Sequence, residues 1–539
     1  MQIEKAALPL NNLIRDYKNQ DTYIMKYFDY PPFAGSFENR AKDLAQRTFN
    51  RAGLADTLLE LNKRWQAPTQ TIQNIERLRA TDSMVVIGGQ QAGLLTGPLY
   101  TVNKVISLIQ LARQQAAELG KPVIPVFWIA GEDHDFEEVN HVYMPAGSQL
   151  KKHKIGHYIN EKRSVTYIEK DAEKSKIWLD EVFAALPETE RTKNLYDTVK
   201  RCLNESTTYV DFFAKLIFLI FKDSGVVLLD SADPEIRALE KPYFKKMIQS
   251  QPSIAATVHQ AKETLQQAGY PIALDTAPTD GNLFLQHNGE RILLQCLEPG
   301  QWTGKQGELR ISTEALLEIA ETEPARLSNN VVTRPLMQEC LFPTLAFIGG
   351  NGEIAYWAAL KGAFHALDMK MPPVLPRLSF TFSDKRLEKT IAKLALTQQE
   401  VMENGTAGRK ANWLKSQVNP PLDSMVALLK QTITDAHAPL KETAAAIRSD
   451  IGQLAETNIE RIQNEIDFLH GKMMQAVEQK HEQVLTAFDY AEMVLLPFGG
   501  LQERAWTPLS FINEHGTSFI RELTHVDCVF TEDHYIVHI

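Results

Sequence analysis

The segment at residues 84–104 limits the fold of this chain more than any other. It reads MVVIGGQQAGLLTGPLYTVNK. The apolar residues Met84 to Ile87 predict a strand buried on both faces, and Pro98 predicts the start of a helix. Between them, Gly88 and Gly89 allow a tight turn or a close backbone approach, so the segment could present backbone N–H groups to an anion. A plain connection between strand and helix, without a ligand, is the alternative.

The chain around this segment alternates between strand and helix patterns. A helix pattern over residues 100–119 leads to a second buried strand, Val123 to Ile129. Another helix pattern, residues 210–221, precedes a third apolar run at residues 226–229. Repeated alternation of this kind predicts an α/β fold, namely a Rossmann-like, doubly wound parallel sheet covered by helices on both faces.

A second glycine-rich corner occurs late in the chain. The apolar run that ends at Ile348 is followed by the sequence GGNG at residues 349–352, and a helix pattern begins near Glu353. Ligands of open α/β sheets bind beyond the carboxyl ends of the strands. We therefore expect the two glycine corners to face each other across one crevice.

The changes in pattern divide the chain into core, insertions and a helical part. Short strands separated by turn residues, within residues 271–335, indicate an insertion into the sheet domain. We expect residues 1–150 to form the first half of the core with N-terminal helices, 151–209 a connecting-peptide insertion, 210–270 a continuation of the core, 271–335 a second connecting-peptide insertion, 336–383 the second half of the core, 384–490 a coiled-coil domain and 491–539 a segment that docks on the core.

Coiled-coil spacing marks the α-helical domain. Apolar residues spaced by three and four are typical of a coiled-coil seam. The seam residues are Ile459, Ile462, Ile466, Leu469 and Met473, and Leu440, Ile447 and Leu454 extend a seven-residue step upstream. Pro439 is expected to separate this helix from one at residues 422–437, which would make a bent hairpin. We expect a homodimer contact through this domain, with packing inside one chain as the alternative.

Composition excludes several classes of function. The formal net charge of −10 argues against broad nucleic-acid binding, which needs a basic surface. The apolar runs are too short for a membrane-spanning helix. The four cysteines are scattered and form no C-x-x-C pair, which favours reduced thiols and a cytoplasmic location.

The densest polar cluster, GEDHDFEEVNH at residues 131–141, follows the second strand directly. Glu132, Asp133 and His134 supply acids and a base that could hold an ammonium group or move a proton. A metal site built on His134, Asp135 and His141 is a weaker interpretation, because their spacing matches no named ligand pattern. A solvated acidic loop is the plain alternative.

Other polar residues cluster at the two glycine corners. Side-chain amides, a tyrosine hydroxyl and a lysine follow the first corner, while Arg377 after a later strand could clamp a phosphate or carboxylate through two hydrogen bonds. We expect Asp133 and His134 to be catalytic. The expected binding residues are Gly88, Gly89, Gln90, Gln91, Thr96, Gly97, Tyr100, Lys104, Glu132, Glu353 and Arg377.

Five strings carry a family resemblance. In order, they are GGQQAGLLTGPLYTVNK, FWIAGEDHDFEEVNH, FIGGNGEIAYWAALK, PRLSFTF and LPFGGLQERAW. Together they resemble the bacillithiol biosynthesis cysteine-adding enzymes of Firmicutes, over essentially the whole chain. The resemblance implies a core related to class I aminoacyl-tRNA synthetases, connecting-peptide insertions and a dimer-forming coiled coil. It also implies a ligase that joins cysteine to glucosaminyl-malate, the last step in making bacillithiol.

The sequence departs from class I synthetases at their signatures. Neither H-I-G-H nor K-M-S-K-S occurs, and no cysteine-rich zinc ligand set is present, so no metal is expected. ATP is the candidate co-substrate, and the activated intermediate is left open. The other hypotheses are a dimeric, nucleotide-sensing scaffold of the same pathway and a metal-dependent hydrolase built on the acidic cluster.

Overall fold

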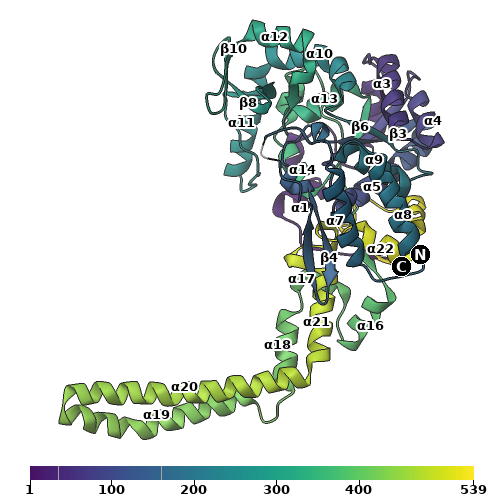
Figure 1. Cartoon of the computed structure of the whole chain (residues 1–539). Coiled ribbons are helices and arrows are strands. Elements are labelled where there is room, and N and C mark those ends of the chain that lie inside the picture. Colours follow the sequence, from purple (N-terminus) through teal and green to yellow (C-terminus); the bar gives the residue numbers. More distant parts are fainter. Residues whose placement is uncertain (34, 160) are drawn as a thin grey trace. The chain divides into compact units, whose positions relative to one another are not determined.

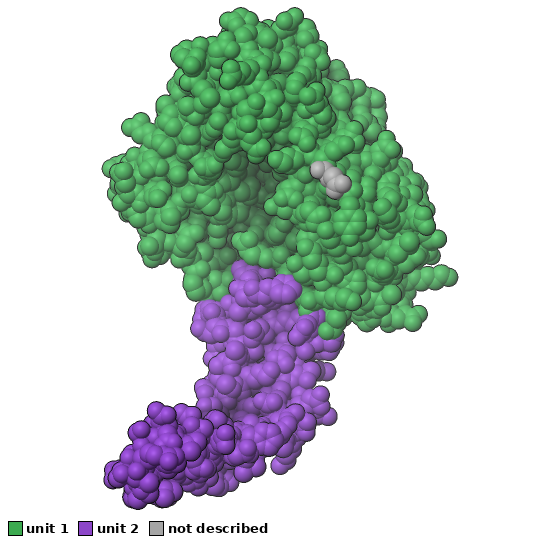
Figure 2. Space-filling view, turned by 60° about the vertical axis from the view of Figure 1, so that its left-hand side comes forward, with its two compact units in different colours: residues 1–146, 150–383, 502–539 green, residues 147–149, 384–501 purple. Residues whose placement is uncertain are grey.

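The computed structural model describes residues 1–33, 35–159 and 161–539. These residues form two compact units, coloured separately in Figure 2. The larger unit comprises residues 1–146, 150–383 and 502–539, and the smaller unit comprises residues 147–149 and 384–501. None of the helices in the described ranges is both long and apolar enough to cross a membrane.

A five-stranded sheet forms the centre of the larger unit. Its order is β13 (Val374–Pro376), β12 (Thr344–Gly349), β2 (Met84–Gln90), β3 (Val123–Ile129) and β6 (Val227–Asp230). Every neighbouring pair is parallel. Within this sheet, the first strand in chain order is β2, in the middle. The next strands, β3 and β6, extend the sheet on one side of β2, and the last two, β12 and β13, extend it on the other side. This is the doubly wound order of a Rossmann-like sheet and confirms the predicted fold class.

Helices between the strands cover this sheet (Figure 1). The longest of them, α5 (Leu99–Leu119), packs on β2 and β3, and the connection from β2 through α5 to β3 is the predicted β-α-β unit. Of the other helices, α2 (Ser36–Leu44) contacts β12, α3 (Arg51–Arg64) and α4 (Thr69–Arg77) contact β6, and α14 (Asn351–Trp357) contacts β12 and β13. The same unit also contains α9 (Tyr209–Ile220), α10 (Pro234–Gln249), α11 (Gln251–Gln267), α13 (Thr333–Leu341) and α15 (Lys361–His365). All seven residues of β3 are buried, as expected for a central parallel strand.

A separate antiparallel sheet is inserted before β12. Its order is β10 (Arg310–Ser312), β9 (Gln301–Gly304), β8 (Glu290–Glu298), β7 (Asp280–His287) and β11 (Leu327–Asn329), and α12 (Thr313–Thr322) follows β10. The short strands predicted within this part of the chain are thereby confirmed. An earlier stretch contains β4 (His141–Ala146), β5 (Gln149–Lys154), α7 (Ala172–Ala184) and α8 (Thr192–Asn204).

A three-stranded sheet joins the two ends of the chain. The last strand, β15 (His534–His538), pairs with β1 (Gln2–Ala6) on one side and with β14 (Phe380–Ser383) on the other. Two helices that precede β15, α22 (Pro508–His515) and α23 (Ser518–His525), also belong to the larger unit. Of these, α23 packs on α5. No pattern in the sequence predicted this sheet, because the partner strands lie hundreds of residues apart.

The smaller unit is helical. Its helices are α16 (Lys385–Lys393), α17 (Gln398–Asn404), α18 (Ala407–Ser416), α19 (Leu422–Ile447), α20 (Ser449–Lys480) and α21 (Glu482–Leu495). α19 and α20 lie side by side as an antiparallel hairpin (Figure 1). Hydrogen bonds from Lys441 to Glu456 and from Gln463 to Thr434 link them.

The predicted break at Pro439 is wrong. α19 continues through Pro439, and the chain turns instead at Arg448, whose backbone is extended. An internal proline removes one backbone hydrogen bond, and packing against α20 along the helix offsets that loss. The predicted seven-residue step is wrong for the same reason, because Leu440 and Ile447 lie on α19 whereas Leu454 lies on α20.

Candidate functional site

A cavity of about 410 Å³ opens at the carboxyl ends of the central strands. Residues 89–91 at the end of β2 and residues 350–353 after β12 line it. β2 and β12 are neighbours at which the strand order reverses, the place where open α/β sheets bind ligands. The expectation that the two glycine corners face one crevice is confirmed.

Close backbone approach explains the first two glycines of the turn. A Cβ atom on Gly88 would lie 2.8 Å from the carbonyl oxygen of Ile348, and one on Gly89 would lie 2.5 Å from the carbonyl oxygen of Trp128. Both oxygens belong to neighbouring strands of the sheet. The glycines therefore allow the strand spacing at the cavity floor, where a side chain would collide with backbone.

Gly89→Ala is expected to lower the free energy of unfolding by about 1–3 kcal/mol, because the added methyl group must push β2 and β3 apart. Chemical denaturation would measure the change. Gly352→Ala is the matched control, since Gly352 lines the same cavity but a Cβ there would meet nothing within 4 Å. Equal stability of the two variants would contradict the explanation.

A buried ion pair ties the two corners together. Lys104 Nζ lies 2.6 Å from Glu353 Oε2 and donates to the carbonyl oxygen of Gly89, also at 2.6 Å. Glu353 in turn accepts the backbone N–H of Gly350. Burial lowers the pKa of Lys104, although Glu353 opposes this shift. The ammonium group of Lys104 is thus already held by protein atoms, and it fixes the geometry of the cavity wall.

The alternative that the acidic cluster is a solvated loop is wrong for Glu132, because this residue is fully buried. Its carboxylate accepts hydrogen bonds from Arg237 Nη2 at 2.5 Å and from Arg334 Nε at 2.7 Å. Burial alone would raise the pKa of the Glu132 carboxyl, but the surrounding arginines, Arg237 first, outweigh it and lower the pKa. Glu132 is therefore an anionic anchor beneath the cavity.

Arg237 continues this network away from the cavity. Its guanidinium group also donates to Glu240 Oε2 at 2.6 Å, and both side chains are buried. Burial raises the pKa of Glu240 to about 7, against the opposing effect of Arg237. One arginine therefore holds two buried carboxyl groups, Glu132 and Glu240.

Asp133 and Arg334 bring opposite charges to the cavity wall. Arg334 Nη2 donates to Asp133 Oδ1 at 2.7 Å, and the two side chains are 22% and 23% exposed. Both residues line the cavity. Arg334 comes from the first turn of α13, and no motif in the sequence indicated its role.

His134 lies outside the cavity lining. Its Nδ1 lies 3.1 Å from Arg291 Nη1, and arginine can only donate, so Nδ1 accepts and the ring proton is on Nε2. Burial and Arg291 lower the pKa of His134, which favours the neutral ring. Arg291 comes from β8, so the inserted sheet supplies this partner.

Arg377 lines the cavity, but its fork already binds a protein carboxylate. Its two terminal nitrogens lie 2.5 Å and 2.6 Å from the oxygens of Glu503. Glu503 also accepts a hydrogen bond from Asn103. Burial would raise the pKa of Glu503, but Arg377 outweighs it and lowers that pKa to about 2. The two-hydrogen-bond clamp expected at Arg377 thus holds the C-terminal segment on the core.

The predicted site residues divide into two groups. Those that line the cavity are Gly89, Gln90, Gln91, Tyr100, Lys104, Asp133, Glu353 and Arg377. Outside its lining lie Gly88, Thr96, Gly97, Glu132 and His134. Cavity residues that the sequence interpretation missed include Arg334, Gln338, Tyr356 and Arg504. Arg334 and Gln338 on α13 and Arg504 near the C-terminus lie outside both glycine corners, so the spacing of those corners contained no signal for them, whereas Tyr356 lies on α14 directly after the second corner.

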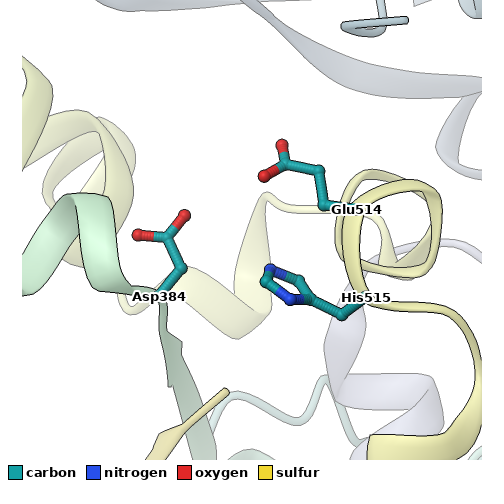
Figure 3. A group of neighbouring side chains, drawn as sticks. All are labelled: Asp384, Glu514 and His515. Carbon is teal, nitrogen blue, oxygen red and sulfur yellow. The ribbon is translucent and has the colours of Figure 1, made fainter. Parts of the chain in front are cut away.

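The metal interpretation of the acidic cluster lacks a ligand set. In the described ranges, His134, Asp135 and His141 do not form a group of converging ligand atoms. Figure 3 shows three other side chains of metal-ligand type, Asp384, Glu514 and His515. Asp384 caps α16 in the smaller unit, whereas the other two end α22 in the larger unit.

Asp230, at the end of β6, is a buried carboxyl group next to the acidic cluster. Thr166 Oγ1 lies 3.0 Å and 2.9 Å from its two oxygens, and the backbone N–H of Ala232 also donates to it. Burial raises the pKa of Asp230 from its ordinary value of 3.8 to about 7. A Cβ on Gly131 would strike both Thr166 and Asp230, so these groups pack tightly under the loop.

Asp230→Asn is expected to flatten part of the pH dependence of stability. The folded protein keeps a proton on Asp230 that the unfolded chain loses, so this group destabilises the fold as pH rises from 3.8 toward 7. Over that range, the free energy of unfolding of the variant should therefore increase relative to that of the wild type, by up to about 1.4 kcal/mol per pH unit. Denaturant titrations at several pH values would measure it, and parallel curves would refute it.

Fold and site together define a Rossmann-like α/β protein with a cavity lined by charged residues at the switch point of its sheet and a helical-hairpin unit. Residues 1–378 match the family model for the N-terminal Rossmann-like domain of bacillithiol biosynthesis BshC. Residues 380–539 match the model for the C-terminal coiled-coil domain of the same family. The chain therefore belongs to the bacillithiol biosynthesis BshC family.

Full-length relatives agree with this assignment. A protein of Oceanobacillus iheyensis is 41% identical over 534 residues, which cover 98% of each chain. A protein of Bacillus cytotoxicus is 39% identical over 537 residues, which cover 100% of each chain. Both carry the name "Putative cysteine ligase BshC".

Proposed function

We propose that this protein is a ligase that forms an amide between the carboxyl group of cysteine and the amino group of glucosaminyl-malate, the last step of bacillithiol synthesis. Membership in the BshC family and the names of the relatives support a cysteine ligase. The sequence resemblance supports the acceptor.

The observation that carries this proposal is the pair of Asp133 and Arg334 on one cavity wall. A free amino acid has an ammonium group and a carboxylate on the same carbon. A protein carboxylate beside a guanidinium group complements both charges, and the guanidinium can hold a carboxylate through two hydrogen bonds. We assign the cysteine ammonium to Asp133 and its carboxylate to Arg334.

The reacting carboxyl group would then lie against a fixed cation. Arg334 would offset negative charge that develops on the carboxyl oxygens as the amine attacks, and its position is fixed in advance by Glu132. Of the two predicted catalytic residues, Asp133 is the one that lies in the cavity lining, and we assign it the role of proton acceptor. His134 remains a prediction as a proton carrier, since it lies outside that lining.

Amide formation from a free carboxylate needs activation, and we propose ATP as the co-substrate. Doubly wound folds bind nucleotides at the switch point, where this cavity lies. We also propose a cytoplasmic location. Cys202, Cys296, Cys340 and Cys528 are all free thiols in the structure, which fits a reducing compartment.

The direct test supplies purified protein with cysteine, glucosaminyl-malate and ATP and detects the conjugate by mass spectrometry. Conjugate formation with stoichiometric loss of ATP is expected. Reactions that lack ATP identify the energy source, and reactions with serine in place of cysteine test the amino-acid preference. Absence of conjugate, combined with normal bacillithiol levels in a strain that lacks the gene, would reject the proposal.

We further propose that the hairpin of α19 and α20 binds a second copy of this chain. Coiled-coil helices bury an apolar seam against a partner, yet large apolar side chains of this hairpin are between 42% and 73% exposed. They are Met425, Leu428, Leu429, Leu440, Ile447, Leu454, Phe468, Leu469 and Met473.

Leu428→Glu together with Phe468→Glu is expected to weaken self-association at least about 10-fold, because a dimer would have to bury an unpaired charge. Sedimentation equilibrium would measure the dissociation constant. Leu297→Glu is the control, since Leu297 is 63% exposed but lies on β8 in the larger unit. A monomeric wild type, or a dimer that tolerates the double change, would contradict the proposal.

A further inference from the structure

A second cavity, of about 270 Å³, adjoins the large one. Gln91, Tyr100 and Arg504 line both cavities, so the two share a wall. The remaining lining of this side cavity comes from Gly93 and Gly97 in the glycine turn, from the start of α5, from residues 138, 139 and 141–143, and from residues 505 and 507. Among the predicted binding residues, Gly97 lines this side cavity and not the large one.

Arg504 is the distinctive charge at this shared wall. Lys104, Arg334 and Arg377 also line the large cavity, and each is already paired with a carboxylate of the protein. Arg504 is exposed, and within the described chain no carboxylate lies at ion-pair distance from it. Its guanidinium group can therefore pair with an anionic ligand at no cost to an existing ion pair.

Other groups in the side cavity also suit an anion with hydroxyl groups. The cavity is lined by Pro98, Tyr100 and Thr101, at the N-terminal end of the 21-residue helix α5, where the helix dipole is positive. His141 also lines this cavity, and its Nδ1 is shielded from solvent. Burial lowers the pKa of His141, so its neutral ring can exchange hydrogen bonds with hydroxyl groups.

The acidic residue of this cavity is already engaged. Glu138 Oε2 accepts a hydrogen bond from Gln91 Nε2 at 2.7 Å. Gln91 is one of the shared-wall residues, so this bond holds the wall between the cavities. The large cavity thus provides Asp133 for an ammonium group, and the wall that it shares with the side cavity provides Arg504 for a carboxylate.

We propose that the side cavity binds the dicarboxylate end of the acceptor substrate, with one carboxylate on Arg504. This inference rests on the proposed function, whose acceptor is an amino sugar linked to a hydroxy-dicarboxylic acid. The two ends of that molecule differ in charge. Its acid end matches the side cavity, and its amino end reaches past Gln91 and Tyr100 toward the cysteine held in the large cavity.

Calorimetric titration of the full-length protein tests this placement. Glucosaminyl-malate and cysteine are titrated separately into the wild type and into Arg504→Gln. We expect the variant to bind glucosaminyl-malate at least 10-fold more weakly and to bind cysteine with unchanged affinity. Arg310→Gln is the matched control, because Arg310 is an exposed arginine on β10 outside both cavities, and it should leave both affinities unchanged.

The outcomes separate this inference from the proposed function. If Arg504→Gln binds glucosaminyl-malate within twofold of the wild type, or if Arg310→Gln loses as much affinity, the placement is wrong. A wild type that does not bind glucosaminyl-malate also overturns it. If the wild type binds both substrates but forms no conjugate with ATP, the ligase proposal fails, while the effect of Arg504→Gln on binding still decides whether Arg504, on the wall shared by the two cavities, holds the acid end.

Discussion

Arg334→Gln is expected to lower kcat/KM for cysteine by about 10- to 100-fold, the usual effect of removing a hydrogen bond between charged groups. The reason is the position of Arg334 beside Asp133 on the cavity wall. Glutamine keeps much of the side-chain length but lacks the charge and the fork that would hold a carboxylate. Steady-state kinetics with varied cysteine would measure the loss.

The pattern of kinetic constants distinguishes binding from a structural role. The KM for glucosaminyl-malate should be unchanged, and Arg334→Lys should recover part of the activity because it restores the charge without the fork. Melting temperatures would show whether the variant is folded, since Glu132 keeps its hydrogen bond with Arg237. If both substrates lose affinity equally, or if activity stays within twofold of the wild type, Arg334 does not hold the cysteine carboxylate.

Arg237→Met is expected to lower the free energy of unfolding by about 3–5 kcal/mol, because it leaves buried carboxyl groups without their shared cation. Arg237 is 1% exposed, and its two partners, Glu132 and Glu240, are fully buried. Methionine has a similar length, so the change removes charge more than volume. Urea denaturation followed by circular dichroism would measure it.

A double-mutant cycle shows whether the loss comes from the unpaired charge. Glu240→Gln alone should cost less than Arg237→Met, because Arg237 keeps Glu132. Adding Glu240→Gln to Arg237→Met should recover part of the stability, since Glu240 is the carboxyl group that Arg237→Met leaves unpaired, whereas Glu132 keeps Arg334. A loss below about 1 kcal/mol for Arg237→Met would mean that the network is not stabilised as described.

The central sheet and its switch point were predictable because they depend on local patterns. Val123 to Ile129 was predicted as a strand and forms β3 with the same bounds. Continuous apolar runs, glycine corners and intervening helix patterns are properties of short segments. The rules of parallel crossovers then convert them into one topology, which brings Gly89 and Gly350 to the same cavity.

The charge network of the site was not predictable in the same way. Glu132 was identified as part of an acidic cluster, but its partners Arg237 and Arg334 lie 105 and 202 residues further along the chain. An arginine in a helix pattern looks the same whether it faces solvent or a buried carboxylate. Sequence spacing therefore could not tell that Glu132 is an anchor, or that Arg377 is occupied by Glu503.

The sequence by itself determined the doubly wound fold, the position of the crevice and the family. The spacing of apolar residues, the placement of glycines and the order of motifs are all properties of contiguous stretches of sequence. The tertiary structure alone decided which charges are satisfied and which remain available to a ligand. Lys104, predicted to bind an anion, is held by Glu353, whereas Arg504 has no carboxylate at ion-pair distance among the described residues. The physical reason is that pairing and burial depend on distances between residues far apart in the chain, and those distances exist only once the chain has folded.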